Sequence, residues 1–190
     1  MILSPGTKLD SGQLVFRENS TSNNLFVFDV QDRSRTALLN SDFSGRAAAI
    51  SHNGKLLAYE SNRGGSNDVY VRPFPGPGTE TAVSIGGGYG PMWSPDDSEI
   101  YYLYRGGGET HIIAASLHGD PRFRILGQEK LFDGVRFWNL PSGAHYDVHP
   151  DGQRFLVLNM RSADEEVAKI NVVLNWFEEL KRRVPTGTDQ

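Results

Sequence analysis

One pattern of polar and hydrophobic positions recurs along the chain. A polar turn ends in Gly or Asp, one or two polar residues follow, and an apolar run then begins. The two clearest copies are 93–97 (WSPDD) before 99–104 (EIYYLY), and 148–152 (VHPDG) before 154–158 (RFLVL). The pattern occurs again at 50–54 and, in weaker form, at 9–12. This repetition predicts that one small structural unit is built four times.

The spacing of the repeat indicates the architecture. The four turns end at positions 12, 54, 97 and 152, so the intervals are 42, 43 and 55 residues. A period of about 40–45 residues is typical of a four-stranded propeller blade. We interpret the longer last interval as an insertion between Phe123 and Ser142.

Short apolar runs separated by Gly-rich hairpins predict an antiparallel all-β fold. We expect a β-propeller or partial propeller of about four blades, each a four-stranded sheet. The expected blades cover 1–45, 46–88, 89–141 and 142–185. Asp97 occupies the turn position where the other copies have Gly, and we expect it to adopt the left-handed conformation.

The C-terminal segment has a different pattern. Asn175 followed three residues later by Glu178 resembles a helix capping box, and Pro185 is expected to end the helix. We therefore expect a short helix over 176–184 and a flexible tail over 186–190.

Composition excludes several classes of function. The chain has 190 residues, a net charge of −4 and no Cys. Thiol catalysis, disulfides and thiolate metal sites are therefore excluded. A mildly acidic chain does not favour nucleic-acid binding, and no apolar run is long enough for membrane insertion.

These residues are where a family becomes recognisable. The repeat at 93–97 and the strand at 67–71 (NDVYV) resemble those of TolB-like, WD-repeat-like propellers. The C-terminal blocks 146–155 (YDVHPDGQRF) and 170–180 (INVVLNWFEEL) resemble the propeller part of bacterial eukaryotic-type serine/threonine kinases and related sensor proteins. The chain has no kinase motifs of its own.

The resemblance carries expectations beyond the fold. Propellers of this type commonly have six or more blades, whereas four are counted here. The ring therefore either closes with four blades, pairs with a second copy through open blade edges, or belongs to a longer bacterial protein. The resemblance also implies an extracytoplasmic, periplasmic location, although the chain carries no targeting signal of its own.

Three residues form a candidate metal site. His145, Asp147 and His149 alternate along a predicted strand, so they would share one face. Imidazole and carboxylate groups are ligands for zinc or another divalent cation. In the alternative interpretation His149 is part of the repeat turn and Asp147 is structural, and no cofactor is bound.

Two functions follow from these patterns. In the first, the chain is a non-catalytic binding or sensor module that takes a protein, peptide or small ligand at the propeller channel or rim. Tyr89, His145 and Tyr146 are then the candidate contacts, with His111 as a weaker one. In the second, the chain is a hydrolase that uses His145, Asp147 and His149, or a serine, although it has no Gly-x-Ser-x-Gly motif.

Overall fold

The structure is a computed structural model, in which the described residues are all strands, turns and loops. They are 2–3, 12–18, 24–39, 42–106, 109–118, 123–132, 146–157 and 171–173. The predicted helix at 176–184 and the tail at 186–190 lie outside them. No helix long and apolar enough to span a membrane is found in these residues.

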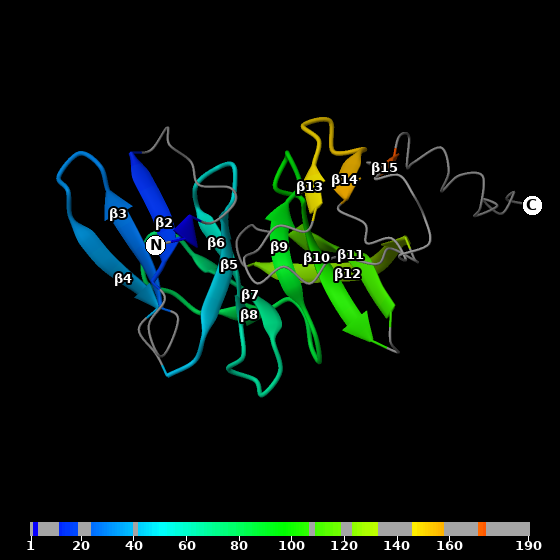
Figure 1. The fold of residues 1–190 in the computed structure, drawn as a ribbon, viewed down its shortest axis with the longest axis horizontal. Helices are drawn as coiled ribbons and strands as arrows, with labels where there is room; N and C mark the ends of the chain where they lie inside the picture. The colour runs from blue at the N-terminus through cyan, green and yellow to red at the C-terminus, as the bar shows by residue number, and fades with distance from the viewer. Residues whose placement is uncertain are drawn as a thin grey trace, which may run out of the picture.

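The strands form four antiparallel sheets that follow one another along the chain (Figure 1). The first contains β1 (Ile2–Leu3), β2 (Gln13–Arg17), β3 (Leu25–Asp29) and β4 (Arg35–Leu39). The second contains β5 (Gly45–Ile50), β6 (Leu56–Ser61), β7 (Asp68–Pro73) and β8 (Thr81–Ala82). The third contains β9 (Tyr89–Trp93), β10 (Glu99–Gly106), β11 (Glu109–His118) and β12 (Arg124–Phe132). The fourth contains β13 (Tyr146–Val148), β14 (Phe155–Val157) and β15 (Asn171–Val173).

Within each sheet the spatial order of the strands equals their order in the chain. This meander is the topology of a propeller blade, and we call the sheets blades 1 to 4. The predicted all-β propeller of four-stranded antiparallel sheets is confirmed in the first three blades, and three strands of blade 4 are described.

Hydrophobic contacts between neighbouring blades make up the core. One cluster joins blades 1 and 2, a second joins blades 2 and 3, and a third joins blades 3 and 4. The middle strands β6 and β10 are buried on both faces, because each lies between two neighbouring blades. Such strands have continuous apolar runs instead of alternation, which explains the sequence of Ile100–Leu103.

The repeated turns connect the first and second strands of blades 2, 3 and 4. The same hydrogen bond closes all three, from the backbone N–H of the fourth turn residue to the carbonyl of the first. Its N–O distance is 2.9 Å from Gly54 to Ser51, 3.0 Å from Asp97 to Ser94 and 2.8 Å from Gly152 to His149. The fourth residue has a positive φ in each turn, and at Asp97 it is 60°, as predicted.

The two ends of the strands differ in what they carry. We call the end formed by the turns 51–55, 94–98 and 149–154 the turn rim. It lies at the top of Figure 1. The connections between blades, 42–44 and 83–88, precede the first strand of the next blade and therefore lie at the opposite end. We call that end the linker rim.

Candidate functional site

Charged side chains from three blades gather at the linker rim. Arg17 ends β2, Arg46 is the second residue of β5, Glu60 is next to last in β6, and Arg105 is next to last in β10. Neighbouring strands run in opposite directions, so all four positions fall at the same end of their sheets. We call these four residues the arginine cluster.

Glu60 lies at the centre of the cluster. It is 7% exposed, and it is the cross-strand partner of Arg46 in the β5–β6 pairing. Burial raises the pKa of the Glu60 carboxyl above its usual value, against the opposing effects of Arg46, the backbone N–H of Gly90, Arg105 and Arg17. The three guanidinium groups therefore all act on one buried carboxyl, and they offset its burial only in part.

Arg17 lacks a fixed partner for part of its guanidinium group. Its Nε is buried and makes no hydrogen bond with any described residue. Burial lowers the pKa of Arg17, and the positive charge of Arg46 lowers it further, while Glu60 raises it. A buried donor without an acceptor is destabilising, so this Nε adds to the free-energy cost of the cluster.

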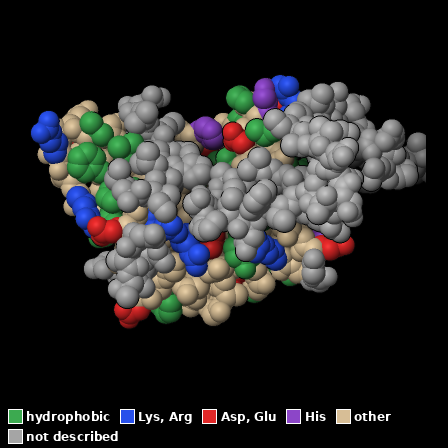
Figure 2. All heavy atoms as spheres, viewed as in Figure 1, with side chains coloured by type: hydrophobic (Ala, Val, Ile, Leu, Met, Phe, Trp, Pro, Cys, Tyr) green, Lys and Arg blue, Asp and Glu red, His purple; other side chains and the backbone are tan. Residues whose placement is uncertain are grey.

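Arg46 and Arg105 are each oriented by a neighbour. Arg46 Nε donates to Ser44 Oγ at 3.1 Å, and the Arg105 guanidinium carbon lies 5.0 Å from the centroid of the Tyr89 ring. This second contact is a cation–π interaction. Figure 2 shows Lys and Arg side chains together with Asp and Glu side chains in the lower half of this view.

Guanidinium groups suit the binding of planar anions. Each presents N–H donors in a fork that matches a carboxylate or phosphate group. A cluster with several such forks and one carboxyl can bind and orient an acidic ligand. Its described side chains include no nucleophile paired with a base.

The predicted ligand residues are placed differently from one another. Tyr89 begins β9 and lies beside the cluster through Arg105. Tyr146 is 3% exposed and donates its hydroxyl to the Gly90 carbonyl at 2.9 Å. Burial raises its pKa well above the usual value. Tyr146 therefore supports Gly90 from within the core, while the N–H of Gly90 bonds Glu60.

The predicted metal site is only partly described. His145 lies outside the described residues. Asp147 is exposed and accepts a hydrogen bond from the N–H of Val148 at 2.8 Å. His149 is in a repeat turn at the turn rim, where its Nε2 lies 2.7 Å from Arg154 Nη2. The nearby guanidinium group disfavours a cation at His149, and no group of three potential metal ligands occurs in the described part of the chain.

Two further features lie away from the cluster. His111 on β11 has a side chain that is 13% exposed, and its Nε2 is 3.9 Å from Glu109 Oε2. A cavity of about 460 Å³ lies near the turn-rim end of blade 2. Among its lining residues, Arg72 already donates to the carbonyls of Leu38 and Gly76.

Sequence reasoning did not identify the arginine cluster. Three of its members lie near the ends of the second strands of their blades, but different residue types occupy these places and Arg46 is in a first strand, so no motif connects them. The sequence contained one local signal. Glu60 follows directly on the apolar run 56–59, and such a run predicts a buried strand. A charged residue in such a run is seldom buried without an oppositely charged partner.

Comparison by sequence matches the chain to no protein-family model and to no curated protein. Comparison of structures finds a protein described as TolB from Agrobacterium tumefaciens, with a TM-score of 0.67 and 20% identity over 90% of this chain and 57% of that one. TolB from Acinetobacter baumannii has a TM-score of 0.62 and 19% identity, over 84% of this chain and 38% of that one. An oligogalacturonate lyase in complex with manganese has a TM-score of 0.66 and 13% identity, over 90% of this chain and 50% of that one.

These neighbours agree with the fold derived from the blades. The chain spans about half the length of the TolB proteins or less, and the identities are too low to transfer an activity. The fold of this chain is therefore that of a TolB-like β-propeller.

Proposed function

We propose that this chain is a non-catalytic binding module whose ligand surface is the linker rim at the arginine cluster. The observation that carries the proposal is the convergence of Arg17, Arg46 and Arg105 on the buried Glu60. Burying charge costs free energy, and a well-packed apolar set would stabilise the same place at least as well. Charges kept at such a place are best explained by a ligand that they bind.

The setting of the cluster supports binding. Its members come from three rigid sheets, so their spacing is set before any ligand arrives. A preformed site loses little conformational entropy on binding. Propeller neighbours such as TolB support a binding module of this type.

We further propose that the chain acts as the C-terminal portion of a larger bacterial propeller protein, such as a kinase-linked sensor. Its coverage of 38% and 57% of two TolB chains supports this proposal. Pairing of two copies through open blade edges stays a prediction, and light scattering by the 21.1 kDa chain tests it.

Backbone NMR tests the location of the ligand surface without knowledge of the ligand. The labelled chain is titrated with a fragment library that contains acidic, neutral and basic members. Chemical-shift changes are expected at Arg17, Arg46, Glu60 and Arg105, while the turn 94–97 stays unchanged. Changes concentrated at the cavity near Arg72, or turnover of ester, peptide or phosphate substrates, would contradict the proposal.

A matched pair of substitutions distinguishes the effect of the arginine cluster from the effect of overall charge. Arg46→Gln is expected to abolish the shift changes. Arg124→Gln removes the same charge from an exposed residue at the outer strand β12 and is expected to leave them intact. Equal effects of the two substitutions would show that only the overall charge matters.

A further inference from the structure

Two large hydrophobic side chains are exposed on the linker rim. Ile85, in the connection between blades 2 and 3, is 89% exposed. Phe43, in the connection between blades 1 and 2, is 47% exposed. Each occupies a connection that leads into the first strand of the next blade. Exposed apolar groups beside polar ones are a feature of interaction surfaces.

Both connections lie beside the arginine cluster. Ser44, next to Phe43, accepts the hydrogen bond from Arg46 Nε, and its own N–H donates to Asn62 Oδ1 at 2.9 Å. In the other connection, Gly87 lies against the backbone of β10. A side chain at Gly87 would meet the carbonyl oxygen of Arg105 at 3.4 Å.

The connection that carries Ile85 is held on both sides by one buried carboxylate. Asp68 Oδ1 accepts hydrogen bonds from Ser84 Oγ and from the N–H of Gly87, each at 2.9 Å. Asp68 is 5% exposed, and Ser84 is 2% exposed. Ile85 therefore stands out from a short segment whose flanks are fixed. An apolar side chain presented in this way is immobilised at low cost when a partner binds.

We propose that the linker rim docks an acidic peptide segment of a partner protein. A carboxylate of the segment binds Arg17 and Arg46 beside Glu60, and aliphatic side chains next to it pack on Ile85 and Phe43. This inference rests on the proposed function, because it names the ligand class of the same surface. Charge complementarity selects the acidic partner, since Arg17 and Arg46 outnumber the Glu60 carboxyl that they share.

The apolar residues select a peptide over a small anion or a nucleic acid. A single carboxylate or phosphate would occupy the guanidinium groups and leave both connections unused. Nucleic acid requires a broad basic surface, whereas the chain has a net charge of −4. A peptide carries acidic and aliphatic side chains on one continuous chain, as binding to both kinds of group requires.

Selection from a displayed library of 12-residue peptides tests the inference on the whole chain. Enriched peptides are expected to contain Asp or Glu next to aliphatic residues. One enriched peptide is then synthesised with a fluorescent label, together with a copy in which each acid is replaced by its amide. Anisotropy is expected to show at least tenfold weaker binding of the amide copy.

Three variants locate the bound peptide. Arg46→Gln and Ile85→Ser are each expected to weaken binding at least fivefold, while Arg124→Gln leaves it unchanged. Ile85 is almost fully exposed, so its substitution should not disturb folding. Thermal unfolding of each variant checks this point.

The outcomes separate the inference from the proposed function. Enriched peptides without acids, or no enrichment at all, would overturn the acidic-peptide inference. The proposed function would still stand if NMR shift changes map to the cluster. Equal binding by wild type and Arg46→Gln, with shift changes at another surface, would overturn both.

Discussion

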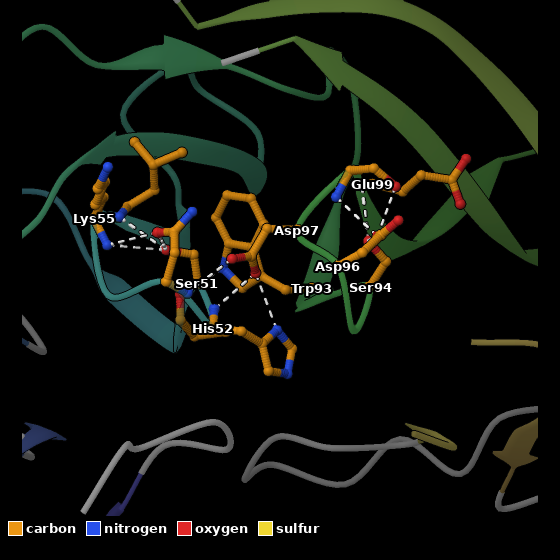
Figure 3. Close-up of polar contacts among 12 residues, drawn as sticks. Ser51, His52, Lys55, Trp93, Ser94, Asp96, Asp97 and Glu99 are labelled. Atoms are coloured by element: carbon orange, nitrogen blue, oxygen red, sulfur yellow. Dashed lines mark hydrogen bonds and ion pairs between the residues drawn. The ribbon is translucent and has the colours of Figure 1, made fainter. Parts of the chain in front are cut away.

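Two carboxylates at opposite rims of the same blades, Asp97 and Glu60, have contrasting surroundings. At the turn rim, the side chain of Asp97 is 10% exposed, and its oxygens accept hydrogen bonds from the N–H groups of His52 and Asn53 at 2.7 and 2.8 Å (Figure 3). At the linker rim, Glu60 is buried and shares its surroundings with three arginines. The first arrangement joins two blades by hydrogen bonds, and the second surrounds one carboxyl with three positive charges.

The turn rim shows what a structural polar network looks like. Ser51 Oγ accepts hydrogen bonds from the N–H groups of Lys55 and Leu56, and Ser94 Oγ accepts one from Glu99. Trp93 Nε1 donates to the Ala49 carbonyl at 3.0 Å. Each of these three side chains bonds the backbone of its own turn or of the neighbouring blade. Histidine side chains at the upper edge of Figure 2 belong to this rim.

The largest expected effect comes from the contact between blades 2 and 3. Trp93 is 5% exposed and lies in their shared core cluster. Trp93→Ala is expected to lower the free energy of unfolding by about 3–5 kcal/mol, because it leaves a cavity. Urea denaturation measures the loss. Trp93→Phe serves as the control that mainly removes the hydrogen bond. A loss below about 1 kcal/mol for Trp93→Ala would contradict the placement of Trp93 in the core between blades 2 and 3.

Substitutions of Asp97 measure the backbone strain at its positive φ. Asp97→Ala removes both backbone contacts and keeps the positive φ, so we expect a loss of about 2 kcal/mol in the free energy of unfolding. Asp97→Gly loses the same contacts and relieves the strain, so it should be more stable than Asp97→Ala by about 1 kcal/mol. Thermal unfolding compares them. A Gly variant no more stable than the Ala variant would show that the backbone is not strained.

Tyr146 tests the link between the core and the arginine cluster. Tyr146→Phe removes the hydrogen bond to the Gly90 carbonyl and is expected to cost about 1 kcal/mol. The matched control is Tyr102→Phe, because the Tyr102 hydroxyl bonds the side chain of the exposed residue Gln128 and its loss should matter less. Chemical denaturation of both variants decides. Equal losses of stability would mean that the hydrogen bond to Gly90 contributes no more than the one to Gln128.

The smallest effect concerns the pH dependence of stability at Glu60. Burial raises the pKa of this carboxyl in the folded state above its ordinary value of 4.5. Its contribution to stability is therefore fully present below pH 4.5 and is lost as the pH rises through the folded-state pKa. Glu60→Gln keeps an acceptor for the Gly90 N–H and has no charge to bury.

Urea denaturation at a series of pH values measures this difference. The stability of Glu60→Gln relative to wild type is expected to increase as the pH rises through that window and then to level off. A decrease in this relative stability as the pH rises would show that the arginines outweigh burial and hold Glu60 ionised.

Much of the architecture was predictable from the chain because its determinants are local. A turn of the 94–97 type depends on four adjacent residues, and the positive φ at Asp97 follows from its place in the repeat. The number and type of sheets follow from the spacing of such turns. The ligand residues were less predictable, because Tyr146 has the sequence pattern of an inner strand but is buried against blade 3.

The sequence by itself determined that the chain repeats one antiparallel sheet, since hydrogen-bonded turns and apolar runs act over a few residues. Only the tertiary structure decided which charges meet. Arg17, Arg46, Glu60 and Arg105 lie on four strands of three blades, and their proximity depends on how neighbouring sheets pack. Packing between sheets is set by the whole core, so no short motif records it.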